Sequence, residues 1–419
     1  MLVRTKVTVD WPLIVSALLL SLYGLAIVYS AGQTDIPTLV RLAWRQQLVW
    51  FLLGLAGAYA MSRASVRMLE WMAVPMYVFT VVLLLSLLFV GGGAGTAAST
   101  KSWLVVGGFR LGQPAEFAKL TVVLILARLL AGKKDPPRTL VELWKPAVTV
   151  AIPWVLIMLQ PDLGSGIVFI GIFFAMLFWA GISWRLLLLI ASPVISLILV
   201  AAGTGLWGAW FLLLLALVLW YKPYMWEGVF LVTTNVMMGV VAPLLWERLE
   251  PYQQRRLLVF IDPSLDPRGS SYHVMQSKIA IGSGGWFGEG FTLGSQKRLA
   301  FLPEQHTDFI FAVLGEELGF LGVVVALALF LVLFLRIIRI AERANDSFSS
   351  LVAFGLLSSW FVHVIVNVGM TLNLMPITGI PLPFFSYGGS FMLASWLAVG
   401  ALLRIAHEGR GGKHGPFAI

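Results

Sequence analysis

The sequence predicts an all-α protein, a polytopic bundle of transmembrane helices that forms one integral membrane domain over residues 1–419. Hydrophobic residues make up 59% of the chain and charged residues only 12%, a balance far from that of a soluble domain. Apolar runs of about 20 residues, the length that crosses the hydrocarbon core of a bilayer, recur along the chain. In lipid such a run must satisfy its own backbone hydrogen bonds, so each is predicted to be a helix.

The composition also excludes several classes of function. The net charge is +9, but the basic residues fall mainly in short segments between the apolar runs, where they orient a membrane protein and meet anionic lipid headgroups. No basic domain with interleaved aromatic residues is present, so no nucleic-acid partner is expected. The chain has no cysteine, and its five histidines lack the spacing of metal ligands, so no dedicated metal site is predicted.

Twelve apolar segments are predicted to cross the membrane. In chain order they are 11–31, 46–62, 70–91, 114–131, 146–161, 164–182, 184–203, 207–220, 225–246, 308–336, 350–372 and 385–406. The first has span length and is expected to stay as a signal anchor. If only one of the segments 207–220 and 225–246 crossed the membrane, every later loop would change sides and the basic residues after span 308–336 would lie outside. Residues 207–246 are therefore predicted to be one helical-hairpin insertion.

The charge of the loops predicts the orientation. With the N-terminus inside, the inner segments hold seventeen lysines and arginines, and the short outer loops hold four. Because positive loops stay in the cytoplasm, both termini are expected there. The long polar segment 247–307, which precedes span 308–336, is then an extracytoplasmic loop.

Ionisable side chains within spans are rare and usually face a partner or a cavity. Glu116 and Lys119 stand three residues apart near the outer end of span 114–131, on one helix face. We expect them to form an ion pair inside the bundle. A compatible interpretation is that the pair lines a polar cavity that opens outward.

Four further polar positions are predicted to be structural in the first instance. Asp162, in the turn QPDLGSG, is expected to cap the following helix, although it could equally face the outer cavity. One of Glu316 and Glu317 is expected to pair with a basic residue or with polar backbone inside the bundle. His363 and Asn367, four residues apart, are expected to be packed and hydrogen-bonded rather than catalytic.

The segment 371–390, TLNLMPITGIPLPFFSYGGS, is predicted to be irregular backbone at membrane depth. It contains three prolines and three glycines in an apolar setting. Such backbone is tolerated only where protein or a water-filled cavity surrounds it. The broken helices of transporters look similar, which keeps a transport function open as an alternative.

The loop 247–307 combines carboxylates, basic residues and closely spaced glycines, which let backbone fold tightly and approach a ligand. The run GSGGWFGEG lacks the strand–helix context and the lysine of a nucleotide-binding motif. An outer, basic site over a membrane bundle indicates an anionic substrate. A phosphate-bearing lipid is the substrate class that fits both features.

Several long motifs carry a resemblance to a known family. They are DPRGSSYHVMQSKIAIGSGGWFGEG, GSQKRLAFLPEQHTDFIFAVLGEELGFLG and ITGIPLPFFSYGGS, preceded by KSWLVVGGFRLGQPAEFAKL and QPDLGSG. In this order and over nearly the whole chain they resemble the RodA/FtsW (SEDS) family, RodA more than FtsW. The resemblance implies ten family spans, to which 207–246 adds two.

The resemblance also implies an activity. Members of this family are peptidoglycan glycosyltransferases that polymerise lipid II at the outer face of the bacterial cytoplasmic membrane, in cell elongation or division. They work with a class B penicillin-binding protein as transpeptidase partner. Two alternatives stay open, a lipid II flippase and a scaffold that only recruits the transpeptidase.

Site residues follow from the same resemblance. The family's catalytic aspartate matches Asp266, as general base, and Asp262 is its rival because it also precedes a proline. Glu116 and Lys119 correspond to a functional pair. Substrate contacts are expected from residues near the site and from cations that would stabilise a departing pyrophosphate: Trp103, Gln276, Ser277, Arg255, Arg256, Lys278, Lys297 and Arg298.

One position departs from the family's pattern. Glu289 stands where relatives often carry lysine, so a positive charge expected near the loop is missing. A divalent cation that assists the pyrophosphate remains an open alternative, although no cofactor is required by the sequence.

Overall fold

The computed structural model describes residues 10–35, 39–92, 102–106, 109–133, 135–221, 224–248, 254, 259–260, 270–302 and 304–409. Twelve long helices lie in these residues, and each overlaps one predicted span. They are α1 (Trp11–Ala31), α2 (Ala43–Arg63), α3 (Val66–Val90), α4 (Pro114–Ala131), α5 (Trp144–Met158), α6 (Leu163–Trp179), α7 (Trp184–Ala202), α8 (Thr204–Tyr221), α9 (Met225–Arg248), α13 (Ile310–Glu342), α14 (Ser347–Thr371) and α15 (Gly389–Gly409).

The helices have the length and apolar character that a polytopic membrane protein needs. Within the described residues, eight are long and apolar enough to cross a membrane, and α6 and much of α7 are shorter apolar helices. Their outward faces carry large hydrophobic side chains, such as Phe79 and Leu212, that are more than half exposed. Such a surface is stable only in lipid, so the protein is a multi-pass membrane protein.

Short elements between the spans were not predicted. Strands β1 (Leu104–Val106) and β2 (Phe109–Gly112) pair antiparallel and form a short hairpin within a fold that is all-α, as predicted. The two residues between them in the sequence are both glycine, a composition that favours a tight hairpin turn. In the part of the segment 270–302 that the structure describes, before α13, lie the short helices α11 (Ser270–Ser283) and α12 (Ser295–Arg298).

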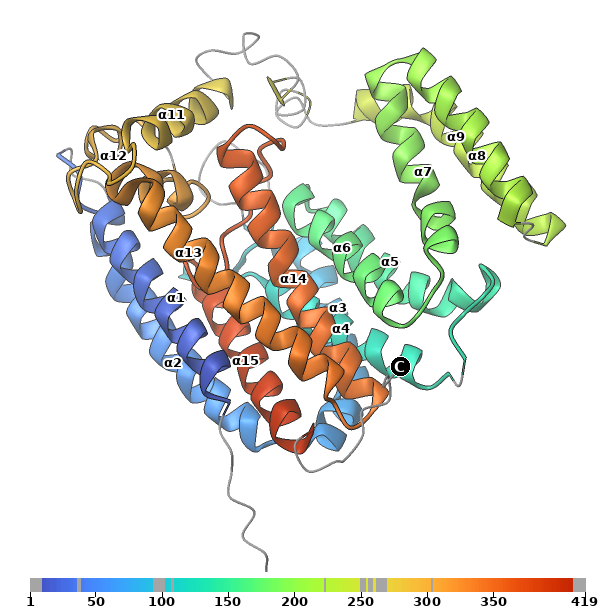
Figure 1. Ribbon diagram of the computed structural model, residues 1–419, viewed down its shortest axis with the longest axis horizontal. Helices are drawn as coiled ribbons and strands as arrows, with labels where there is room; N and C mark the ends of the chain where they lie inside the picture. The colour runs from blue at the N-terminus through green and yellow to red at the C-terminus, as the bar shows by residue number, and fades with distance from the viewer. Residues whose placement is uncertain are drawn as a thin grey trace, which may run out of the picture.

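Both described ends of the chain lie at one end of the bundle, and α11 and α12 lie at the other (Figure 1). Asp10, which caps α1, forms an ion pair with Arg336 near the end of α13. At the end of α15, Glu408 accepts a hydrogen bond from the Val66 backbone N–H. We call this the terminal end of the bundle, and the opposite end, which carries α11, the loop end.

Helix α13 is interrupted at Gly319, where φ is 62° and ψ is −161°. The segment 284–290 runs alongside this break: the N–H of Gly290 donates to the Glu317 carbonyl, and the N–H of Phe320 donates to the Gly285 carbonyl, at 3.0 and 2.8 Å. A β-carbon at Gly284 would lie closer to the Gly315 carbonyl group than atoms can approach. The glycine-rich run therefore serves close backbone packing onto α13.

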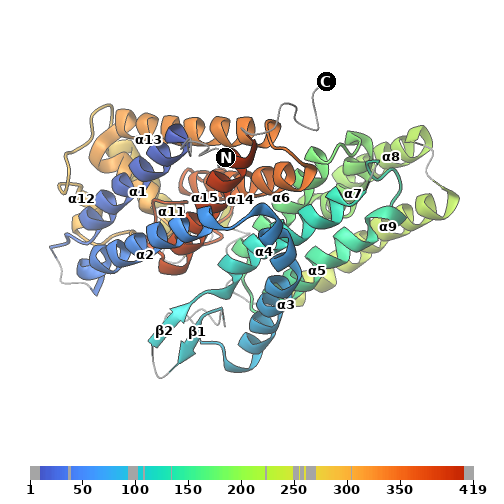
Figure 2. The ribbon, with the colours of Figure 1, turned by 90° about the horizontal axis from the view of Figure 1, so that it is seen from below.

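Helices α7, α8 and α9 form an arm at one side of the bundle (Figures 1 and 2). Both α8 and α9 pack along α7 and touch each other little, so the segment predicted as a two-helix hairpin belongs to a three-helix unit. Its interior holds a polar network: Asn235 donates to Ser192 at 2.8 Å and accepts from Ser196 at 2.6 Å. Small and polar side chains of this kind hold helices together in lipid, where no hydrophobic force does so.

Candidate active site

The segment between α14 and α15 enters the bundle from the loop end as irregular backbone, as predicted for 371–390. Residues 372–388 contain no helix, and their apolar side chains are largely buried. Asn367 of α14 donates to the Ile380 carbonyl at 2.8 Å and to the Asp308 carbonyl at 2.9 Å. Protein thus surrounds this segment, which we call the re-entrant segment, and satisfies part of its backbone.

Glu116 and Lys119 form the predicted ion pair in the first turns of α4. Lys119 Nζ lies 2.7 Å from Glu116 Oε2, and the two side chains are only 3% and 4% exposed. Lys119 Nζ also lies 2.8 Å from His363 Nε2 of α14 and 5.2 Å from the centre of the Phe391 ring at the start of α15. One cation therefore joins three helices, and protein covers both charges of the pair in this conformation.

Asp162 lies beside this cluster and has the capping role predicted for it. Its Oδ1 accepts a hydrogen bond from the Ser165 N–H at 3.0 Å, which confirms the N-cap of α6. Its Oδ2 accepts from Gln113 Nε2 at 2.9 Å, and the Gln113 backbone N–H donates to Ser390 Oγ at 2.9 Å. This half-buried network ties the start of α4 to the starts of α6 and α15.

His306 precedes α13 and lies under the re-entrant segment. Its carbonyl accepts from the Tyr387 N–H at 2.9 Å, and its ring packs against the ring of Tyr387 with centroids 5.4 Å apart. Burial lowers the pKa of His306, while the nearby Glu304 carboxylate opposes this shift. Burial thus favours the neutral form of the ring.

A second buried ion pair braces the loop end of the bundle. Lys297 Nζ lies 2.6 Å from Glu317 Oε1 and donates to Ser30 Oγ at 3.0 Å, and both charged side chains are fully buried. This confirms the expectation that one of the two adjacent glutamates of α13 pairs with a basic residue. In this structure the Lys297 ammonium is paired and is enclosed by α1 and α13, and its binding of pyrophosphate stays a prediction.

The neighbouring Glu316 caps the short helix α12. Its carboxylate accepts from the backbone N–H groups of Gln296 at 2.6 Å and Lys297 at 3.3 Å, and its side chain is buried. A carboxylate is the preferred partner for such unpaired N–H groups at a helix start. Together the two glutamates attach the segment 284–298 to α13.

The other predicted site residues have different settings. Asp262, Asp266, Arg255 and Arg256 lie outside the described residues. Lys278 is exposed on α11, and Gln276 of the same helix is half-buried. Ser277 is fully buried and donates to the Thr371 carbonyl at 2.9 Å, which fastens α11 to the end of α14.

Trp103 and Arg298 complete the set. The backbone of Trp103 pairs with that of Gly92 at the end of α3, so this tryptophan opens the β-hairpin that leads to α4. Arg298 is 44% exposed and forms an ion pair with Asp35 at 3.1 Å. The structure thus gathers Glu116, Lys119 and His363 in one cluster, whereas Lys297 and Arg298 lie in the separate brace near α1.

One feature of the site was not anticipated from the sequence. The contact of His363 with Lys119 joins residues 244 positions apart, and no local pattern signals it. Within the described residues no group of three or more His, Cys, Asp or Glu side chains is placed to hold a metal ion.

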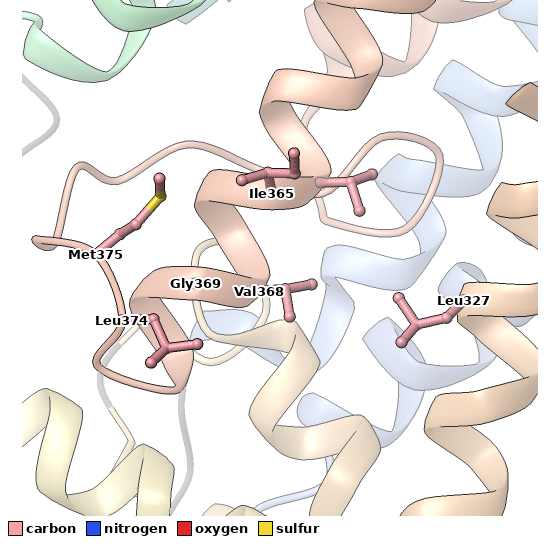
Figure 3. Close-up of a pocket in the computed structure, with 7 residues that line it drawn as sticks. Leu327, Ile365, Val368, Gly369, Leu374 and Met375 are labelled. Atoms are coloured by element: carbon pink, nitrogen blue, oxygen red, sulfur yellow. The ribbon is translucent and has the colours of Figure 1, made fainter.

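An apolar groove of about 370 Å³ lies between α13 and α14 (Figure 3). Leu327 of α13 faces Val368 of α14 across it, and Leu374 and Met375 of the turn after α14 close one side. Its lining contains no charged side chain and none of the predicted site residues. The groove suits a hydrocarbon surface and not a phosphate group.

Comparison with known proteins decides the family. A family model described as a cell cycle protein, of the FtsW/RodA/SpoVE type, matches residues 10–209 and 204–411. The chain belongs to the FtsW/RodA/SpoVE family. The two matched ranges meet at the start of α8, in the arm.

Named members of the FtsW/RodA/SpoVE family are similar to the chain over almost its whole length. The peptidoglycan glycosyltransferase RodA of Treponema pallidum is 34% identical, over 94% of this chain and 97% of that protein. The peptidoglycan glycosyltransferase MrdB of Escherichia coli K12 is 34% identical, over 96% and 94%. A probable peptidoglycan glycosyltransferase FtsW of Trichlorobacter lovleyi is 32% identical, over 95% and 93%.

Solved structures of the FtsW/RodA/SpoVE family agree with this fold. A chain from a study of how a peptidoglycan synthase complex coordinates polymerization and crosslinking superposes with a TM-score of 0.72 at 27% identity, over 97% of this chain and 99% of that one. The rod shape determining protein RodA of Thermus thermophilus gives 0.62 at 27% identity, with the same coverage.

Proposed function

We propose that this protein is a peptidoglycan glycosyltransferase that polymerises lipid II into glycan strands, in cell-wall elongation or division. The observation that carries the proposal is the position of α11, whose sequence directly continues the DPRGSSY segment around Asp266. Ser277 fastens α11 to the end of α14, at the same end of the bundle as the Glu116–Lys119 pair. A carboxylate as general base and a buried cation are the two kinds of group that transfer from a pyrophosphate-linked sugar needs.

In the proposed reaction the 4-hydroxyl of the acceptor's GlcNAc attacks C1 of the donor's MurNAc. The new bond joins that oxygen to C1, the bond from C1 to the pyrophosphate oxygen breaks, and undecaprenyl pyrophosphate leaves with the bonding electron pair. A sugar hydroxyl is a weak nucleophile, so we assign Asp266 as the general base that accepts its proton. A single displacement inverts the configuration at C1.

Negative charge grows on the departing pyrophosphate, and preorganised cations stabilise it. We assign this role to Arg255, Arg256 and Lys278 in the loop, and to Lys119 within the bundle. Lys119 is enclosed in protein, where the effective dielectric is low and a charge acts over a longer distance than in water. A divalent cation that shares the pyrophosphate charge is a further proposal, and assays with and without a chelator test it.

We further propose that both termini lie in the cytoplasm and that the loop end faces outward. The loop-charge bias and the common position of the two described ends of the chain support this orientation. The solved relative from a synthase complex supports a class B penicillin-binding protein as partner. Residues 207–246 are proposed as an insertion relative to the ten family spans.

The test is polymerisation of lipid II by the purified protein with Asp266→Asn. We expect the rate to fall by about 10²- to 10⁴-fold, the range of a general base. Asp262→Asn is the matched control and should keep its rate within a few-fold. Near-normal polymer from Asp266→Asn would remove the assignment of the base.

The same preparation separates the alternatives. If labelled lipid II crosses the vesicle membrane and no glycan forms, the protein is a flippase and not a glycosyltransferase. Neither movement nor polymer, with retained binding of a transpeptidase, would leave a scaffold.

A further inference from the structure

We infer that His363 is a neutral positioning residue, through which the re-entrant segment sets the place of the Lys119 ammonium. His363 Nε2 lies 2.8 Å from Lys119 Nζ, and His363 Nδ1 lies 2.9 Å from the Pro381 carbonyl oxygen. An ammonium can only donate, and a carbonyl can only accept. Nε2 must therefore present its lone pair to Lys119, and Nδ1 must carry the proton that bonds Pro381.

This arrangement leaves the imidazole no choice of tautomer. A proton on Nε2 would meet a donor, and a bare Nδ1 would leave the carbonyl of Pro381 without this hydrogen bond. The side chain of His363 is fully buried, so water cannot take over either contact. Both groups would then lose a partner in a setting where unmet polar groups are costly.

The aromatic ring of Phe391 holds the same two side chains from α15. It stacks on the His363 ring with centroids 4.6 Å apart and an interplanar angle of 27°. Lys119 Nζ lies 5.2 Å from the centre of this ring, within the range of a cation–π contact. The ammonium is thus placed by a carboxylate, an imidazole nitrogen and an aromatic face.

The link to Pro381 joins this cation to the re-entrant segment. Pro381 follows Ile380, whose carbonyl Asn367 holds one helical turn from His363. A shift of the segment would move the imidazole and, through it, the ammonium. The inference rests on the proposed function to the extent that Lys119 stabilises the leaving pyrophosphate.

The first test does not depend on activity. Nitrogen-15 NMR of the full chain with labelled histidine should show one ring with a protonated Nδ1 and a bare Nε2, and His363→Gln should remove that signal. The inference would be overturned if the signal that His363→Gln removes came from a ring with its proton on Nε2 or on both nitrogens.

The second test measures lipid II polymerisation. We expect His363→Leu to lower kcat by about 10- to 100-fold with little change in KM, because a contact to a charged group is lost at the cation and not at the substrate. His363→Gln should recover most of kcat, since its amide can both accept from Lys119 and donate to Pro381.

The control is Ser350→Ala, which removes another buried hydrogen-bonding side chain from α14 near the terminal end. Ser350 donates to the Ala341 carbonyl at 2.7 Å and accepts from Trp179. Equal losses of kcat from Ser350→Ala and His363→Leu would mean that His363 only stabilises the bundle. Absence of polymer from the unchanged protein would contradict the proposed function alone, and the NMR result would still decide the tautomer.

Discussion

Two buried lysine–glutamate pairs have the same chemistry and different surroundings. Lys119 and Glu116 lie 2.7 Å apart within one helix, and Lys297 and Glu317 lie 2.6 Å apart across two segments. The first pair is in contact with His363, which bears on the re-entrant segment. The second pair ties the loop segment to the transmembrane helices, through Ser30 of α1 and Glu317 of α13.

The difference shows why a basic residue in a functional loop need not meet a ligand. Lys297 donates to Glu317 and to Ser30, and both its ammonium and the opposing carboxylate are fully enclosed. The Lys297 charge is compensated within the protein. In the Lys119 cluster one ammonium contacts groups from three helices, so its position depends on how α4, α14 and α15 pack together.

The largest expected effect is on stability, at the Lys297–Glu317 pair, which we call the brace. Lys297→Met should lower the free energy of unfolding by about 3–5 kcal/mol, because Glu317 would be left as a buried charge without its partner. Thermal unfolding of the detergent-solubilised protein measures this loss. The double variant Lys297→Met/Glu317→Gln should recover most of it, since no charge then remains buried.

The recovery is the decisive half of this experiment. If the double variant stays as unstable as Lys297→Met, the pair stabilises the fold through something other than charge compensation. Polymerisation per folded molecule should return with stability in the double variant. A lasting loss of activity would return Lys297 to the substrate site.

The next effect is on catalysis, in the matched double variant Lys119→Met/Glu116→Gln. Its stability should stay close to that of the unchanged protein, for the same reason as in the brace. Its kcat should fall by about 10²- to 10³-fold, the usual result of removing one group that stabilises transition-state charge. Lipid II polymerisation by equal amounts of folded protein measures this.

Equal activity of the two double variants would contradict the distinction between the two lysine–glutamate pairs. If both retain activity, Lys119 is a second brace and the pyrophosphate is stabilised by the loop alone. If both lose it, the Lys297–Glu317 pair takes part in the reaction as well.

The spans could be predicted from the sequence because hydrocarbon thickness sets their length. The predicted 11–31 and 114–131 coincide with α1 and α4. The β-hairpin, α11 and α12 were missed because short elements in polar segments carry too few residues to show a period. All three helices of the arm were predicted, the last two as a hairpin, but nothing local in α8 or α9 indicates that both pack on α7.

The candidate site was predicted in part for a related reason. Residues three apart on one helix, as in Glu116 and Lys119, meet by helix geometry, which a sequence displays. Lys297 and Ser30 are 267 positions apart, and their contact depends on how α13 and the loop fold together. Contacts of that range decide whether a charged residue binds a ligand or another residue, and one sequence does not reveal them.

The smallest effect is expected at the exposed ion pair beside the brace. Arg298 and Asp35 lie 3.1 Å apart with 44% and 52% of their side chains exposed, so solvent and salt screen the attraction. Arg298→Gln should change the free energy of unfolding by less than about 1 kcal/mol. KM for lipid II should also stay unchanged if this arginine only links the loop to the end of α1. A severalfold rise in KM, with stability intact, would instead show that Arg298 leaves Asp35 to bind the substrate, and would separate it from the buried lysine next to it.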